Sequence, residues 1–133
     1  MITAVDTCVL LDLLLDEPAR GVRAEAALRS ASAEGALILG EVVYAELRPQ
    51  FADRAELDQT LAQLGIAYQP STVEVASLAG ELWAQYRASG GRRQRVIADF
   101  LVGAHAAVLA DRLLTRDKRF YSAHFSDLAI VEP

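Results

Sequence analysis

Short apolar stretches alternate with longer amphipathic stretches along the whole chain. The apolar stretches end at turn-forming or polar residues, a pattern typical of short strands buried inside a sheet. We predict strands at residues 2–5, 36–39, 66–68, 113–115 and 128–131.

Between these strands the apolar positions recur at helical spacing, and capping residues mark several helix ends. Asp6 can cap a helix directly after the first strand, and Pro18 suits the first turn of the next helix. Ser71 and Glu74 have the spacing of a capping box, which predicts that a long helix opens there and runs to the glycine pair at 90–91. The other predicted helices cover residues 41–47, 53–64, 97–109 and a short segment around Phe120.

Strands joined by helical crossovers must run largely parallel, with helices on both faces of the sheet. The chain has 133 residues, 53% of them hydrophobic, which is enough for one compact domain and too little for two. We therefore expect one α/β domain over residues 1–133, with a short, mainly parallel five-stranded sheet. Ligands of such sheets bind beyond the carboxyl ends of the strands.

Four acidic residues fall where that edge of the sheet is expected. Asp6 follows the first strand, Glu46 lies on the helix after the second, Asp99 opens the helix at 97–109, and Asp117 follows the fourth strand. Like charges in a partly dry site repel each other, and a bound cation offsets that repulsion. Oxygen ligands suit Mg²⁺ or Mn²⁺, and no Cys or His spacing indicates zinc. A metal ion held by the four acids fits hydrolysis of a phosphodiester.

Neighbouring residues add to this pattern, although each acid alone is weak evidence because Asp often caps a helix. The Thr115 hydroxyl can hold a nearby carboxylate or metal-bound water, and a simple turn bond is an equal alternative. Three small residues share the helical face of Asp99, which predicts that their helix packs closely on the sheet. They are Gly103, Ala106 and Ala110.

The net charge of −5 argues against a nucleic-acid partner, but the basic residues are clustered. One cluster is Arg92, Arg93 and Arg95, and Arg116 begins the other, which includes Lys118 and Arg119. The first three and Arg116 are candidates for binding substrate phosphates. A solvated loop is the alternative for the segment from 90 to 95.

Four segments together resemble, in order, the motifs of the PIN-domain ribonucleases and especially of VapC-type toxins. They are Val5-Asp6-Thr7-Cys8-Val9-Leu10-Leu11, Val43-Tyr44-Ala45-Glu46-Leu47, residues 97–106, and Leu114-Thr115-Arg116-Asp117-Lys118-Arg119-Phe120. The resemblance implies that the four acids bind Mg²⁺ or Mn²⁺ and cleave RNA, with Thr7 and Thr115 in support. It also implies a transfer or ribosomal RNA substrate, a cognate antitoxin and a homodimer. Cys8 stands where the family usually has Asn, and we expect altered local hydrogen bonding rather than lost activity.

Other functions fit less well. A haloacid-dehalogenase-like phosphatase needs a second Asp where this chain has Cys8, and a receiver domain needs an acidic pair and a Lys that are not present. A PIN fold that binds RNA without cleaving it stays open as the alternative. The lone cysteine and the lack of a leader or an apolar run of ~20 residues indicate a cytoplasmic protein without a membrane partner. We expect packing or solvated roles for His105, His124, Trp83, Tyr86, Asp12, Asp16 and Glu41.

Overall fold

The computed structural model describes residues 1–15, 17–91 and 96–133, and it confirms a parallel five-stranded sheet. The strands are β1 (Ile2–Val5), β2 (Ala36–Leu39), β3 (Ile66–Tyr68), β4 (Arg112–Leu114) and β5 (Ala129–Val131). Their order in the sheet is β3-β2-β1-β4-β5, and every neighbouring pair is parallel. The fourth and fifth strands differ from the predicted bounds by one residue.

The helices lie between the strands as the hydrophobic spacing predicts. They are α1 (Thr7–Leu14), α2 (Pro18–Glu34), α3 (Glu41–Leu47), α4 (Arg54–Gln63), α5 (Val73–Ala88), α6 (Ile97–Leu109) and α7 (Lys118–His124), with a 3-10 turn at Arg48–Gln50 after α3.

The capping box predicted at the start of α5 is wrong. The cap is Thr72, whose hydroxyl accepts a hydrogen bond from the Val75 amide at 3.4 Å. Ser71 instead donates its backbone N–H to Glu41 Oε2 at 2.7 Å. Glu41 therefore ties the start of α3 to the segment before α5, and is not simply solvated as expected.

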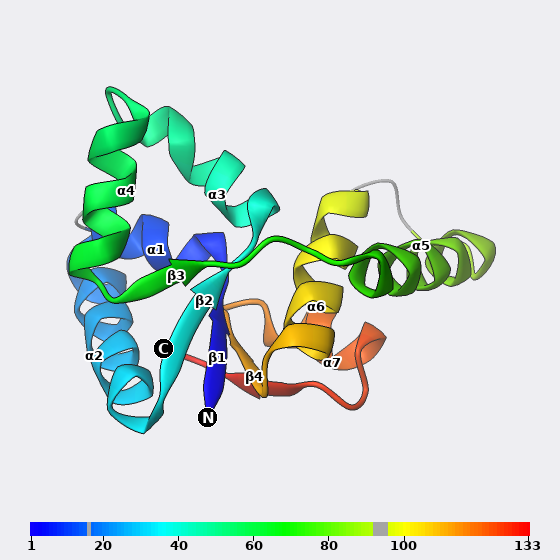
Figure 1. The fold of residues 1–133 in the computed structure, drawn as a ribbon. Coiled ribbons are helices and arrows are strands. Elements are labelled where there is room, and N and C mark those ends of the chain that lie inside the picture. The colour runs from blue at the N-terminus through cyan, green and yellow to red at the C-terminus, as the bar shows by residue number, and fades with distance from the viewer. Residues whose placement is uncertain (16, 92–95) are drawn as a thin grey trace.

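Helices cover both faces of the sheet, as predicted. Figure 1 shows α1 and α2 on one side and α6 with α7 on the other, while α5 lies outside α6. The chain runs from the central strand β1 outward to β2 and β3, and then returns to place β4 on the other side of β1. The connections that follow β1 and β2 thus lead to one side of the sheet, and the connection that follows β4 leads to the other. They diverge at the carboxyl end of β1, and ligands of open parallel sheets bind at such a point.

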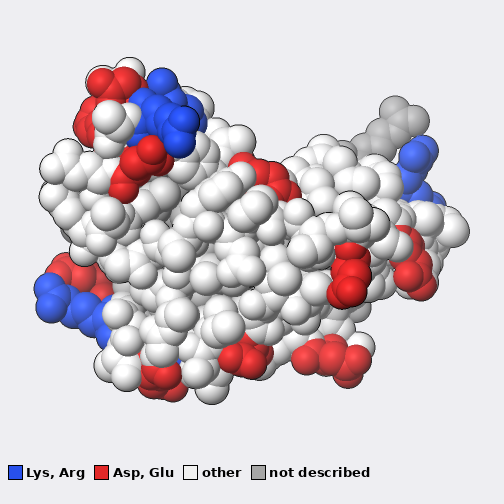
Figure 2. Space-filling view, in the orientation of Figure 1, with Lys and Arg blue, Asp and Glu red and all other residues white. Residues whose placement is uncertain are grey.

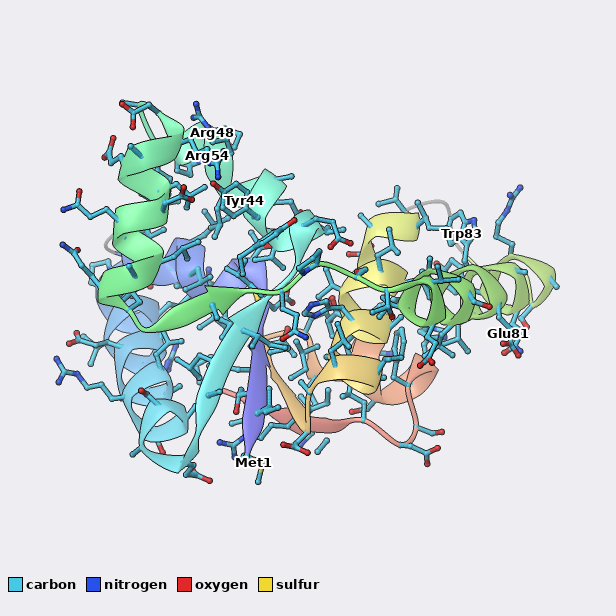
Figure 3. The ribbon with its side chains drawn as sticks, in the orientation of Figure 1. Met1, Tyr44, Arg48, Arg54, Glu81 and Trp83 are labelled. Carbon is cyan, nitrogen blue, oxygen red and sulfur yellow. The ribbon has the colours of Figure 1, made fainter. Side chains whose placement is uncertain are left out.

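An aromatic cluster fills the space between α5, α6 and α7. Phe100 is fully buried, and its ring centroid lies 5.5 Å from that of Trp83 on α5 (Figure 3) and 5.3 Å from that of Phe120. Tyr86 and His124 contact the same ring at 5.3 and 5.8 Å. These contacts confirm the predicted packing roles of the aromatic residues and of His124.

Two residues on α6 explain how that helix is held. His105 is buried, and its Nε2 lies 2.7 Å from the Gln69 carbonyl oxygen, so its predicted packing role is confirmed. A Cβ atom at Gly103 would come within 2.3 Å of the Phe125 ring. Gly103 therefore makes room for the segment after α7, while α6 also contacts β1 and β4 of the sheet as expected. No helix in the described ranges is long and apolar enough to cross a membrane.

Candidate active site

Asp6 stands at the carboxyl end of the central strand and caps α1. Its Oδ1 accepts a hydrogen bond from the Thr7 amide at 2.8 Å, and its Oδ2 accepts one from the Thr115 hydroxyl at 2.7 Å. The Cys8 thiol lies 3.6 Å from the same Oδ2. The carboxylate is thus held by three neutral donors, from the start of α1 and from the end of β4.

The pKa of Asp6 is raised above its usual value, mainly because burial disfavours the charged form. The hydrogen bonds from Thr115, Thr7 and Cys8 lower the pKa in part, and the negative charge of Asp99 raises it further. Asp99 is therefore close enough to repel Asp6, although α6 and β1 are separated by most of the chain. The negative charge of one predicted residue thus acts on another.

Glu46 reaches the same region through Thr7. The buried Thr7 hydroxyl donates to Glu46 Oε1 at 2.9 Å, while the Glu46 side chain stays exposed to solvent. Since Thr7 also donates its amide to Asp6, one residue links two of the four acids. The sequence predicted a supporting role for Thr7, and this geometry is consistent with it.

Thr115 connects Asp117 to Asp6. Its hydroxyl is fully buried, donates to Asp6 and accepts the Asp117 amide at 3.0 Å. Both alternatives considered for this hydroxyl are therefore present, the carboxylate contact and the turn bond. Asp117 is held directly after β4, at the start of α7.

Asp99 lies in the first turn of α6 and is half-buried. Its Oδ2 accepts a hydrogen bond from the Val96 backbone amide at 3.3 Å, so the carboxylate also caps its own helix. Negative charge near a helix N-terminus is favourable, which partly offsets its repulsion by Asp6.

Tyr121 is a site residue that sequence reasoning missed. It lies one turn after Asp117 on α7 and is buried. Its pKa is raised well above the usual value, first by burial and then by the negative charges of Asp6, Asp99, Cys8 and Asp117. A single buried phenol thus experiences the field of three predicted acids. Its spacing of four residues from Asp117 was the signal that could have identified it.

The chemistry of these groups fits a hard divalent cation. Four carboxylates supply only oxygen ligands, and the raised pKa of Asp6 shows that negative charge there lacks full compensation. Within the described ranges, however, no group of three or more His, Cys, Asp or Glu side chains is placed to hold one ion. Carboxylates of like charge repel each other, so drawing them together around a common point requires a cation.

The basic candidates have different outcomes. Arg92, Arg93 and Arg95 lie outside the described residues. Arg116 pairs with Asp12: its Nε and Nη2 donate to the two carboxylate oxygens of that residue, at 2.6 and 3.3 Å.

That contact also corrects the prediction for Asp12. The residue is only 7% exposed and forms an ion pair with Arg116, so it is not a solvated surface carboxylate. Asp16, for which the same role was expected, lies outside the described residues.

Comparisons with known proteins agree with this architecture. VapBC2 from Rickettsia felis, solved bound to a DNA fragment from their promoter, has a TM-score of 0.77 at 16% identity, over 100% of this chain and 99% of that chain. VapBC-1 from nontypeable Haemophilus influenzae has a TM-score of 0.75 at 16% identity, over 99% and 98%. VapC20 from Mycobacterium tuberculosis, a sarcin-ricin loop cleaving toxin, has a TM-score of 0.60 at 18% identity, over 96% and 98%.

At these identities the likeness establishes the fold alone, and no curated protein matches the chain. A family model supplies the further link. The model described as PIN domain matches residues 3–125, a range that holds all four acids and both threonines. The chain therefore belongs to the PIN domain family.

Proposed function

We propose that this protein is a Mg²⁺- or Mn²⁺-dependent endoribonuclease that acts as the toxin of a bacterial toxin–antitoxin pair. The observation that carries the proposal is Asp6, a carboxylate withdrawn from solvent at the topological switch of the sheet. Its partners in the described chain are neutral donors, and Asp99 repels it. Such a group is costly unless a cation joins it.

Asp6, Glu46, Asp99 and Asp117 are the proposed metal ligands. A bound divalent ion supplies a water of lowered pKa and neutralises charge on the phosphate that is attacked. Thr7 orients Glu46, and Thr115 orients Asp6 while fixing the Asp117 backbone. By family resemblance the products carry a 5′-phosphate and a 3′-hydroxyl.

The biological setting follows from the same resemblance. One structural neighbour is a toxin that cleaves the sarcin-ricin loop, and two others are VapBC proteins. We accordingly propose a cytoplasmic homodimer whose substrate is transfer or ribosomal RNA. Its cognate antitoxin blocks the acidic site with a basic side chain, since Arg pairs well with carboxylates.

The decisive test is removal of charge at constant shape. Asp6→Asn should reduce metal-dependent cleavage of RNA by ~100-fold or more, because the metal contributes several kcal/mol to the transition state. Asp53→Asn is the matched control, because Asp53 caps α4 just as Asp6 caps α1, and Asn caps a helix equally well. Asp99→Asn should behave like Asp6→Asn, and excess chelator should silence the wild type. Full activity of either site variant, or activity in chelator, would overturn the proposal.

A second candidate is a PIN fold that binds RNA without turnover. The observation in its favour is that the described acids are not gathered into a ready three-ligand group. It predicts binding of RNA with no new RNA ends under any metal. Expression in the native host without the neighbouring antitoxin gene separates the two biologically, because only the nuclease should arrest growth while its Asp6→Asn variant does not.

A further inference from the structure

A polar recess lies where α1, α2 and the C-terminal end of the chain meet, and Arg116, the residue between Thr115 and Asp117, is part of its lining. Its lining consists of Asp12, Arg20, Arg23, Arg116, Glu132 and Pro133, and its volume is about 300 Å³. Figure 1 shows the C-terminal end next to α2, consistent with this lining. The volume is at the lower end of the range of small-ligand sites and is ample for a phosphate group.

The charges inside this recess do not cancel. Asp12 is neutralised by Arg116 at 2.6 Å, and Glu132 lies 3.4 Å from Lys118. Arg20 and Arg23 have no ion pair with any carboxylate in the part of the chain that the structure describes. The recess is therefore lined by three arginines and two acidic side chains, and Arg20 and Arg23 are its two arginines without an ion pair in the described chain, in a protein whose net charge is −5.

Two other exposed arginines are each paired with a carboxylate. Arg29 pairs with Glu25 at 2.7 Å, and Arg54 pairs with Asp58 at 3.2 Å. Figure 2 shows the charged side chains of the visible face scattered at its periphery, with acidic groups beside the basic ones near Arg54 (Figure 3). Arg29 and Arg54 are therefore compensated by neighbouring carboxylates, whereas Arg20 and Arg23 in the recess have no such pair within the described residues.

Arg116 also faces the recess with donors to spare. Asp12 accepts hydrogen bonds from its Nε and Nη2, no hydrogen bond from Nη1 is found within the described residues, and 38% of the side chain is exposed. The buried Asp12 fixes the plane of the guanidinium, so little side-chain entropy remains to be lost when an anion binds. Two mobile arginines and one fixed arginine thus line one recess.

The position of the recess identifies its ligand. Arg116 stands between Thr115 and Asp117, whose groups belong to the acidic site, while its own side chain lines the recess. An RNA strand cut at the acids can therefore place a neighbouring phosphodiester against the three arginines. We propose that Arg20, Arg23 and Arg116 form a phosphate subsite that holds the RNA substrate beside the scissile bond. This proposal rests on the proposed ribonuclease function.

The test compares arginines on one helix. Fluorescence anisotropy of a labelled single-stranded RNA of about 20 nucleotides is measured over a salt series, in an Asp99→Asn background that prevents cleavage. Arg20→Gln with Arg23→Gln should weaken binding about tenfold near 0.1 M salt and flatten the slope of log K against log salt by about 0.7 per phosphate lost. Arg29→Gln, also on α2 but paired with Glu25, should leave both unchanged. Thermal melts of all variants should coincide.

Cleavage kinetics separate this proposal from the proposed function. In a protein that keeps Asp99, the double variant Arg20→Gln, Arg23→Gln should show a raised KM and an unchanged kcat. A wild type that cuts no RNA refutes the ribonuclease, whatever the anisotropy shows. A wild type that cuts RNA, together with an unaltered salt slope and KM in the double variant, refutes the subsite. Loss of antitoxin binding with unaltered RNA binding would do the same and assign the recess to an acidic protein partner.

Discussion

Asp6 and Asp12 stand six residues apart at α1, and the structure surrounds them in opposite ways. Asp12 is 7% exposed and receives two hydrogen bonds from the Arg116 guanidinium. Asp6 receives bonds from an amide, a hydroxyl and a thiol, and its described neighbours add the negative charge of Asp99. Within the described residues, Asp12 has a cationic partner and Asp6 does not.

We interpret this difference as one between a carboxylate that stabilises the fold and one that is proposed to bind a metal ion. Burial of an unpaired charge costs several kcal/mol, so a carboxylate needed only for stability gains from an arginine as Asp12 does. Asp6 lies at the same end of the sheet, where an arginine could serve it equally well. Its environment of neutral donors and further acids is instead suited to a cation that comes from solution.

The largest expected effect comes from removing the cation that Asp12 has. Arg116→Met leaves Asp12 buried and unpaired, and should lower the free energy of unfolding by about 3 kcal/mol, a fall of roughly 10 °C in Tm. Adding Asp12→Leu should restore most of that loss, because an apolar pair replaces the ion pair. Arg29→Met, at an exposed pair of the i,i+4 type, should cost under ~0.5 kcal/mol. Equal melts for Arg116→Met and Arg29→Met would remove the contrast between the two carboxylates.

The next effect comes from giving Asp6 the cation that it lacks. Mg²⁺ at ~100 times its dissociation constant should add about 2.7 kcal/mol to the stability of the wild type. Asp99→Asn should melt higher than wild type in chelator, because one repelling charge is gone, and should gain less from Mg²⁺. The measurement is a set of thermal melts in chelator and in Mg²⁺. A Mg²⁺ shift that Asp99→Asn leaves undiminished would place the bound ion elsewhere.

Much of this arrangement could be predicted from local patterns. The strands and helices follow from hydrophobic spacing, and Asp6 and Thr115 could be placed because a residue that follows a parallel strand must lie at the carboxyl edge of the sheet. The chemistry of the Thr115 hydroxyl left two equal alternatives, a carboxylate contact and a turn bond, and the structure contains both. Local patterns succeed here because these positions depend only on the direction and order of strands.

Contacts set by side-chain direction could not be predicted. Arg116 and Asp12 are 104 residues apart, and their pairing depends on which face the chain presents just after β4. The cap of α5 is a closer case, since Ser71 and Thr72 are both good caps. In the structure Thr72 is the cap, and the Ser71 amide instead donates to Glu41, 30 residues earlier in the chain. Gly103 likewise fits Phe125, a partner that spacing along α6 does not reveal.

A smaller effect concerns pH and follows from the raised pKa of Asp6. The folded protein holds the Asp6 proton more tightly than the unfolded chain, whose pKa is about 3.9. The contribution of protonated Asp6 to the free energy of unfolding is therefore fully present below about pH 4, and it is lost as pH rises through the pKa of the folded state. The loss is about 1.4 kcal/mol for each unit by which the folded pKa exceeds the unfolded pKa. In chelator, the wild type should lose stability relative to Asp6→Asn across that interval, and Mg²⁺ should remove the trend. A wild type that gains stability relative to Asp6→Asn over the same interval would show that the Asp6 pKa is lowered.

The smallest expected effect is at Cys8, the departure from the usual PIN pattern. Its thiol lies 3.6 Å from Asp6 Oδ2 and 3.7 Å from the Thr115 hydroxyl, and its pKa is raised by burial and then by the charge of Asp6. The group therefore stays a neutral thiol at pH 7, which donates only weakly. The 2.7 Å bond from Thr115 does most to hold that oxygen. Cys8→Asn should accordingly change the cleavage rate by less than about threefold. Thr115→Val keeps the side-chain shape and removes the hydroxyl. It should reduce the cleavage rate by ~10- to 100-fold, as loss of a group that orients a metal ligand does. Initial cleavage rates at saturating metal compare the two directly. A large loss in Cys8→Asn beside a small one in Thr115→Val would show that the thiol, and not the hydroxyl, positions Asp6.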